Sequence, residues 1–252
     1  MRLGIAGRVG RWLAGAAVGL LVAGPAMAQG AGNGFLFGEP DAQFTIRAGY
    51  AHASAGGDLF QETTDRFTLS KGDFSGPTFG AGIAFRIAPQ FDISLDLDYA
   101  GINKRSEYRD FLDNDNLPIE QTTTFQRVPV MANLKMYLTP RGRSVGRLAF
   151  IPAKVVPWIG AGAGMEWYRF KQSGDFIDFN TNVVSPGEVT TSSWSPALQG
   201  MGGVDVSLTP RIALTGDARY TWSRATPGDD YQGYDKIDLS GVSVALGLTF
   251  RL

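Results

Sequence analysis

Eight segments of the chain alternate apolar residues with polar or small ones, and this alternation constrains the fold more than any other feature. In the stretch FDISLDLDYAG, apolar side chains occupy every second position from Phe91 to Tyr99, and Asp92, Asp96 and Asp98 lie between them. Such alternation is typical of a β-strand whose two faces meet different surroundings. The eight segments span residues 43–53, 76–87, 91–101, 123–138, 156–170, 195–208, 212–223 and 239–252. The chain is therefore predicted to be all-β.

The start of the chain has a different pattern. It carries three arginines, then an uncharged apolar run from Trp12 to Gly24, and then the small-x-small motif Ala26-Met27-Ala28. A basic start, a short apolar run and such a motif are typical of a secretory signal peptide. The predicted organisation is a cleaved signal peptide at residues 1–28, an N-terminal lead-in at 29–42 and one β-domain at 43–252.

The connectors between the eight segments alternate in length. Residues 88–90 and 209–211 form short turns with proline, and a third connector opens at Thr139-Pro140 and extends to about residue 155. Proline suits such turns because it fixes φ and cannot donate to a strand ladder. The other connectors are long and predominantly acidic, and they span residues 54–74, 101–122, 171–194 and 224–238. Short turns at one end and long loops at the other are typical of outer-membrane barrels, whose long loops lie outside.

The apolar face of the segments carries aromatic residues near both strand ends, as in the girdles of transmembrane barrels. The predicted girdle comprises Phe91, Tyr99, Trp167, Tyr220, Trp222 and Phe250. Strands in lipid must close on themselves, because an open edge would leave backbone groups unpaired. We therefore predict an eight-stranded antiparallel up-and-down transmembrane β-barrel with its apolar face toward lipid.

The polar face of the same segments carries equal numbers of basic and acidic residues. The predicted lumen charge network comprises Arg47, Arg86, Arg127, Lys135, Arg219, Arg251, Asp92, Asp96, Asp98, Glu166, Asp205 and Asp217. Eight strands enclose a space that side chains can fill, and buried charges must pair because unpaired burial is costly. The sequence therefore predicts a plugged interior rather than a water-filled pore.

The last strand ends in Gly247-Leu248-Thr249-Phe250-Arg251-Leu252. This ending, together with the eight alternating segments, resembles the small eight-stranded outer-membrane β-barrel proteins of the broad OmpA/OmpW-like class. Members of that class often end in Phe, whereas this chain ends in Leu. The resemblance implies a place in the outer membrane of a Gram-negative-type envelope. It also implies recognition of the last strand by the outer-membrane assembly machinery.

We expect a non-enzymatic protein that supports envelope structure or surface interaction through its long loops. Expected partners are outer-membrane lipids, lipopolysaccharide and an extracellular ligand that the sequence does not name. The alternative is a passage for small hydrophobic molecules, as the OmpW-like resemblance implies. No basic stripe dominates a chain of formal net charge −1, so a nucleic-acid partner is not expected.

A lipid A-modifying hydrolase is the third alternative. The only histidine, His52, precedes Ser54 by two residues, and outer-membrane lipid A deacylases carry such a His-x-Ser pair. Acyl transfer also needs an orienting acid, for which Asp58 and Glu62 are only loop candidates. The chain has no cysteine, and the run Asp113–Asn116 lacks the ligand spacing of an EF-hand. We therefore expect no catalytic residue, metal or cofactor.

Overall fold

The structure is a computed structural model that describes residues 35–113, 116–146, 148–178, 183–228, 231 and 233–252. Residues 1–33 separate from residues 34–252 as a second unit, and only the larger unit is described below. The predicted signal peptide and residues 29–34 of the lead-in lie outside the described residues. No helix among the described residues is long and apolar enough to cross a membrane.

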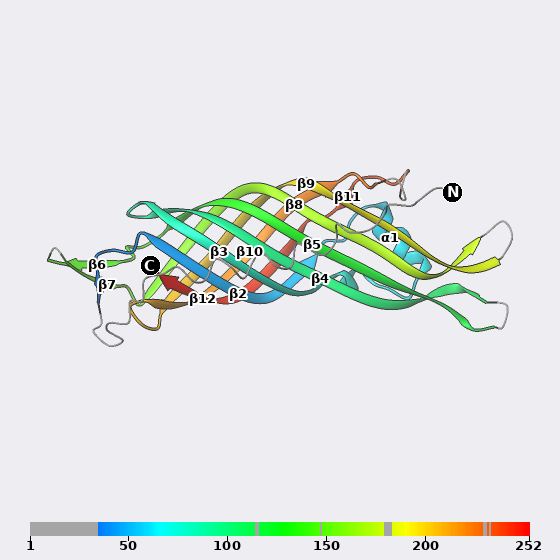
Figure 1. Cartoon of the computed structure of the whole chain (residues 1–252), viewed down its shortest axis with the longest axis horizontal. Coiled ribbons are helices and arrows are strands. Elements are labelled where there is room, and N and C mark those ends of the chain that lie inside the picture. Colours follow the sequence, from blue (N-terminus) through cyan, green and yellow to red (C-terminus); the bar gives the residue numbers. More distant parts are fainter. Residues whose placement is uncertain (1–34, 114–115, 147, 179–182, 229–230, 232) are drawn as a thin grey trace, which may run out of the picture. The chain divides into compact units, whose positions relative to one another are not determined.

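Eight antiparallel strands form a closed ring (Figure 1). They are β2 (Ala42–Ala53), β3 (Gly76–Ala88), β4 (Phe91–Leu112), β5 (Pro118–Tyr137), β8 (Val155–Asp178), β9 (Val183–Ser207), β10 (Ile212–Ala225) and β12 (Gly241–Arg251). Consecutive ring strands pair in chain order, and β12 pairs with β2 to close the ring. The predicted eight-stranded up-and-down barrel is thus confirmed.

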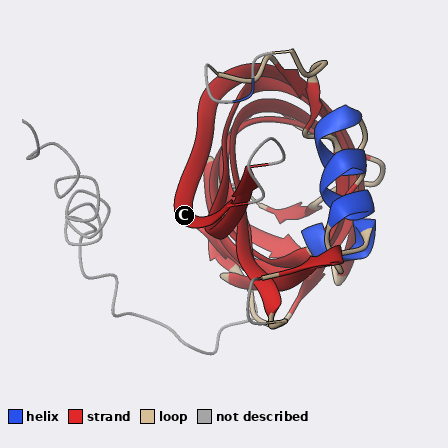
Figure 2. Cartoon of the chain, turned by 90° about the vertical axis from the view of Figure 1, so that its right-hand side faces the viewer, coloured by secondary structure: helices blue, strands red, loops and turns tan. Residues whose placement is uncertain are grey.

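Smaller elements lie at the two ends of the barrel. At the end of the long hairpins, called extracellular below after the prediction from the sequence, are α1 (Asp58–Arg66), η1 (Lys71–Phe74) and β11 (Ile237–Asp238), which pairs with β10. Figure 2 shows the helices at the near end of the strand ring. At the other end, called periplasmic below for the same reason, β1 (Leu36–Phe37), β6 (Gly142–Val145) and β7 (Ala149–Pro152) form a three-stranded sheet. The lead-in is therefore attached to the third connector through β1 and β7.

The two faces of the strands differ in burial as the alternation requires. On β4, Leu95 and Leu97 are more than half exposed, whereas Asp92 and Asp96 on the other face are buried. Apolar side chains on the outer face would be costly in water but suit acyl chains. The apolar face points outward, and the ring encloses the polar face.

We expect Leu95→Arg to lower the free energy of unfolding by about 2–4 kcal/mol, because an arginine on the lipid face near the bilayer middle must leave its preferred water. Leu95 pairs with Ile83 and Ala132, well inside the ring. Equilibrium unfolding in lipid vesicles measures this loss. The control is Leu112→Arg at the exposed end of β4, which should change stability little. Equal effects of the two substitutions would show that Leu95 does not face lipid.

Two hairpins are much longer than the sequence predicts. The predicted ends at residues 101 and 123 lie inside continuous pairing of β4 with β5, which runs on to Glu107 and Glu120. Likewise β8 and β9 stay paired beyond residues 170 and 195 as far as Asp178 and Val183. Outside lipid both strand faces can be polar, so the alternation fades while the backbone ladder continues. Most of the predicted loops at 101–122 and 171–194 are therefore strand.

The first predicted loop, residues 54–74, is also ordered. It contains α1 and η1, and α1 buries Leu59, Phe60 and Thr63. A capping box at Ser70 and Asp73 starts η1, because the Asp73 carboxylate accepts hydrogen bonds from the backbone and the hydroxyl of Ser70 at 2.9 and 2.8 Å. This loop therefore supplies apolar side chains to the barrel mouth.

Candidate functional site: the closed lumen

The extracellular mouth of the barrel is filled by an apolar cluster, termed here the extracellular plug. Its members are Ala53, Ala55, Leu59, Phe60, Phe67, Leu69, Phe74, Phe125, Tyr168, Phe170, Ala225, Tyr231, Ile237 and Leu239. Phe60 of α1 lies at its centre, with ring centroids 4.8 Å from Phe74, 5.3 Å from Phe125 and 5.7 Å from Phe170. The sequence analysis missed this cluster. One signal in the sequence could have revealed the cluster. The inward positions of β5 and β8 change from polar to aromatic residues at Phe125 and Phe170.

Polar groups border the plug where it meets solvent. Burial raises the pKa of Tyr234 to about 12, and the Glu62 carboxylate acts in the same direction. The phenol therefore stays protonated at neutral pH and can donate a hydrogen bond to Glu62. Glu62 also forms an ion pair with Arg66 one helical turn away, so the exposed face of α1 is tied to the loop that carries Tyr234.

The central lumen holds an ion-pair network. Arg47 of β2 donates from Nη1 to Asp96 at 2.9 Å, and from Nε and Nη2 to the two oxygens of Asp98 at 2.9 and 2.7 Å. From the other side of the lumen, Arg219 Nε donates to Asp217 at 2.8 Å, and Arg219 Nη1 lies 3.6 Å from Asp96. All these side chains are almost fully buried. The network links β2, β4 and β10 across the lumen.

Glycines of β3 create the space for this network. In register, Arg47 lies opposite Gly80, and Gly80 lies opposite Asp98. A Cβ at Gly80 would overlap Asp98 Oδ1, and one at Gly82 would overlap Asp96 Oδ1. Arg47 can therefore reach across β3 to the carboxylates of β4. Glycines on the inward face of β8 make similar room, although their neighbours include Met131, Asn133 and Met201 rather than an arginine or a tyrosine.

The periplasmic mouth is closed by a second charged cluster. Buried Asp92 accepts hydrogen bonds from Tyr137 at 2.8 Å and from Arg141 Nη1 at 2.9 Å. The sequence assigns Arg141 to a solvent connector, so its role inside the lumen was missed. The sequence also assigns Arg86 to the lumen network. Arg86 lies in register with Asp92, and it forms its ion pairs with Glu39 and Asp41 of the lead-in at the periplasmic end of the barrel.

Other lumen charges are satisfied without an ion pair. Lys135 Nζ lies 4.0 Å from the ring centroid of Trp158, a cation–π contact. Trp158 Nε1 in turn donates to Asp205 at 3.2 Å, and Arg251 donates to Ser207 Oγ at 2.9 Å. Within the described residues, neither Lys135 nor Arg251 has a carboxylate within 4 Å. One-to-one pairing of six cations with six acids is therefore not the arrangement that the structure shows.

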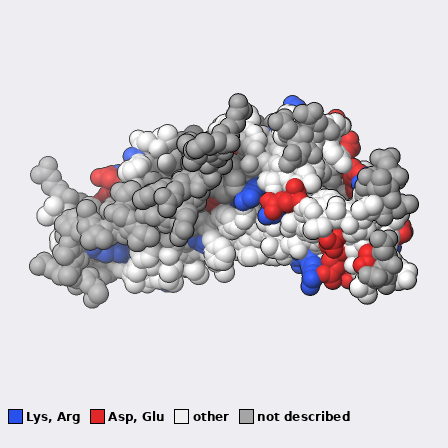
Figure 3. Space-filling view, turned by 45° about the vertical axis from the view of Figure 1, so that its right-hand side comes forward, with Lys and Arg blue, Asp and Glu red and all other residues white. Residues whose placement is uncertain are grey.

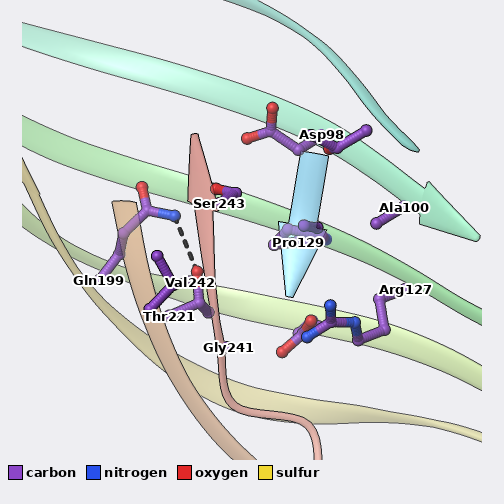
Figure 4. Close-up of a pocket in the computed structure, with 12 residues that line it drawn as sticks. Asp98, Ala100, Arg127, Pro129, Gln199, Thr221, Gly241, Val242 and Ser243 are labelled. Carbon is purple, nitrogen blue, oxygen red and sulfur yellow. Dashed lines mark hydrogen bonds between the residues drawn. The ribbon is translucent and has the colours of Figure 1, made fainter. Parts of the chain in front are cut away.

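Arg127 and Glu166 line a small cavity between the network and the plug (Figure 4). Arg127 Nη1 donates to the Leu239 carbonyl at 2.7 Å, which ties β5 to the segment before β12. Gln199 Nε2 donates to Thr221 Oγ1 at 3.0 Å, the dashed line in Figure 4. Among the described residues, Glu166 Oε2 has no hydrogen-bond partner.

The free space in the lumen is small. The cavity beside Glu166 measures about 30 Å³, and two further cavities toward the periplasm measure about 20 Å³ each. A buried water needs roughly 10–15 Å³, so each cavity has room for one or two waters. The ion-pair network lies between the cavity beside Glu166 and the other two, and the plug lies above all three. None of these three cavities runs through the described lumen from one mouth to the other.

The predicted girdle residues lie on the outer face of the barrel. Tyr99, Tyr220 and Trp222 are 43–49% exposed, and Phe91, Trp167 and Phe250 are partly exposed. The structure adds Trp194, which is 54% exposed and pairs with Trp167 across β8 and β9. The sequence analysis missed Trp194 because it placed residues 171–194 in a loop. Three tryptophans thus lie on the outer face of three consecutive strands.

The candidate pair His52 and Ser54 is not joined by a hydrogen bond in the described structure. His52 Nδ1 instead lies 2.9 Å from Ser75 Oγ, just before β3. Ser75 is buried, and its hydroxyl also accepts a hydrogen bond from the Ala53 backbone at 3.2 Å. No group of three or more metal-ligating side chains occurs among the residues that the structure describes.

A family model described as TonB dependent receptor-like, beta-barrel matches residues 23–252. The chain belongs to this family. Together with the closed ring of eight strands, this match confirms the resemblance to small outer-membrane β-barrel proteins. No curated protein sequence matches the chain.

Similar solved structures are small outer-membrane β-barrel proteins. The outer membrane protein OprG from Pseudomonas aeruginosa is 14% identical, with a TM-score of 0.46 over 86% of this chain and 99% of that chain. Neisserial surface protein A is 14% identical, with a TM-score of 0.45 over 87% of this chain and 98% of that chain. The attachment invasion locus protein Ail of Yersinia pestis is 15% identical, with a TM-score of 0.41 over 84% of this chain and 99% of that chain.

Proposed function

We propose that this family member is a non-enzymatic outer-membrane protein that presents its two long hairpins outside the cell for surface interaction. The observation that carries the proposal is the continuous pairing of β4 with β5, and of β8 with β9, well beyond the outer aromatic residues. A paired ladder holds its strands at a defined place, which suits recognition better than a loose loop. The barrel then acts as an anchor.

The hairpins carry surface charge of both signs. Lys104 lies 3.6 Å from Asp73, Arg105 pairs with Glu120, and Lys171 lies 2.7 Å from Glu188. Figure 3 shows basic and acidic atoms side by side over the right-hand, extracellular end of the visible face. Solvent-exposed ion pairs contribute little stability, so these side chains are available to exchange partners.

The closed lumen supports an anchor rather than a pore. We expect no steady single-channel steps when the purified barrel is inserted into planar lipid bilayers, because three side-chain layers block the described lumen. A porin of known conductance in the same bilayers is the positive control. Steady open-channel steps from the intact chain would overturn the closed-lumen interpretation.

Shortening the first long hairpin, formed by β4 and β5, separates the two roles that an anchored barrel can have. In the test variant, residues 104–121 are replaced by a two-residue turn, so the ring within the membrane is unchanged. Cells that display the intact chain or the variant are compared for retention on immobilised extracellular-matrix proteins and glycans, and for detergent sensitivity. Surface interaction predicts lost retention with unchanged detergent resistance. The reverse result would assign the chain to envelope support.

A passage for small hydrophobic molecules is the second candidate. Pro129 has no backbone N–H, and pairing of β4 with β5 stops at Leu97 and Val130 and resumes at Ala100 and Arg127. This interruption would be the place for a lateral opening. The charged lumen and its small cavities favour the anchor, and the buried Ser75 beside His52 gives little support to a lipid A-modifying hydrolase.

A further inference from the structure

Two arginines lie just beyond the outer tryptophans on the face that the barrel turns to lipid. Arg169 follows Trp167 by two residues in β8, and Arg224 follows Trp222 by two residues in β10. Residues two apart in a strand share a face and are about 6.6 Å apart. Tryptophans of a girdle lie at headgroup level, so these arginines reach the outer headgroup layer.

Trp194 of β9 lies between the two arginines. It pairs with Trp167, while Arg169 pairs with Ser192 one step further out. On its other side, the Ser195 hydroxyl donates to the Arg224 carbonyl at 2.6 Å, which places Arg224 beside the same part of β9. Arg169, Trp194 and Arg224 therefore form one outward patch across three neighbouring strands, termed here the arginine–tryptophan patch.

The patch does not extend to the two strands that follow β10 in the ring. On β12, which pairs with β10, and on β2 beyond it, the outward positions at this end are Val242, Tyr50 and His52, and none of them is a lysine or an arginine. The grouping of both arginines with Trp194 on β8, β9 and β10 therefore indicates a site for an anionic group.

The nearby acids form no ion pair with the two arginines among the described residues. Glu188 is held by Lys171 at 2.7 Å, and Asp238, which pairs in register with Arg224, accepts a hydrogen bond from the Ser240 backbone at 3.0 Å. Among the described residues, no carboxylate lies within 4 Å of Arg169 or Arg224. Arginine binds phosphate through two parallel N–H donors, and an indole ring beside it offers an apolar surface to a sugar or acyl chain.

We propose that the arginine–tryptophan patch binds a phosphate group of the phosphorylated glycolipid in the outer leaflet. The arginines would hold the phosphate, and Trp167, Trp194 and Trp222 would contact the lipid below it. The proposal requires only that the barrel spans the outer membrane with its hairpins outside. A negative result for the patch would therefore not contradict the closed lumen or the proposed interaction of the hairpins.

The test measures binding of purified diphosphorylated lipid A to the full chain in detergent, from the change in tryptophan fluorescence. Each arginine near a charged lipid surface contributes about fivefold in affinity. We therefore expect Arg169→Gln with Arg224→Gln to weaken binding about 25-fold. The matched control, Lys104→Gln with Arg105→Gln, removes two cations of β4, which lies two strands from β8 in the ring, and should leave binding unchanged because both lie further out along their hairpin than Arg169. Heat-modifiable gel mobility shows that every variant is folded.

Three further arms identify the ligand. Enzymatically dephosphorylated lipid A should bind the intact chain as weakly as diphosphorylated lipid A binds the double variant. Inorganic phosphate at millimolar concentration should not compete, because it lacks the lipid part that the tryptophans contact. Binding should survive a chelator of divalent cations. Equal binding by the intact chain and the double variant, competition by inorganic phosphate, or complete loss with the chelator would each overturn the proposal.

Discussion

Arg47→Ala is expected to lower the free energy of unfolding by about 3–5 kcal/mol, the largest effect of any single polar substitution in the lumen. Arg47 makes three hydrogen bonds to Asp96 and Asp98, and its side chain is 2% exposed. Its removal leaves two neighbouring carboxylates buried without their main cation. Arg219 Nη1 lies 3.6 Å from Asp96 and 4.0 Å from Asp98, too far to replace the lost hydrogen bonds.

Urea unfolding of the refolded barrel in detergent micelles measures this effect. Arg47→Lys is the conservative variant: it keeps the charge but loses the paired donors, so its loss of stability should be smaller than that of alanine. Arg105→Ala is the matched control, because Arg105 is 75% exposed and its pair with Glu120 contributes at most about 1 kcal/mol. Similar midpoints for Arg47→Ala and Arg105→Ala would contradict a structural role for the network.

Phe60→Ala is expected to cost about 3–5 kcal/mol in the stability of the extracellular plug, because it leaves a cavity among rings that cannot close over it. Phe60 is fully buried and contacts Phe74, Phe125 and Phe170. The loss should be local. Residues 54–75 connect β2 to β3 and can leave the mouth while the ring beneath stays closed.

Hydrogen exchange of α1 and limited proteolysis of residues 54–75 measure the stability of the plug, and heat-modifiable gel mobility reports on the ring. Phe60→Leu keeps most of the volume and should cost less than about 1.5 kcal/mol. Phe37→Ala, at an 81% exposed side chain, is the control. The Phe60→Ala barrel should still lack channel activity, because the Arg47 network lies below the plug. Unchanged exchange in α1 would show that Phe60 does not hold the plug in place.

Several features of the fold follow from local sequence. Alternation in segments such as residues 91–99 predicts strands, and the two faces of β4 have the burial that the pattern requires. Alternation of short proline turns with long connectors predicts the up-and-down order. These features are readable because strand periodicity and turn chemistry depend on residues close together in the chain.

The sequence shows which residues face the lumen, but it does not show which of these residues contact one another. Arg47 meets Asp98 only because both lie opposite Gly80 in neighbouring registers. Arg141 meets Asp92 because the third connector folds back over the periplasmic mouth. Both contacts join residues far apart in the chain, and local patterns carry no information about cross-strand register.

The long hairpins and the plug show where the pattern fails. Beyond the membrane, β4 and β8 continue with polar residues on both faces, so periodicity cannot mark their ends. Phe125 and Phe170 are readable as strand residues, but their contact with Phe60 depends on how the first loop enters the mouth.

The sequence by itself determined the eight strands, their order and the face that meets lipid, because a bilayer demands alternation and closure from every strand. The tertiary structure alone decided the rest: which cation lies against which acid, how α1 and the aromatic residues close the mouth, and how Arg169, Trp194 and Arg224 meet on one side. Those arrangements depend on stagger between strands and on the folding of loops over the ring. Contacts of this kind form only when distant segments of the chain come together.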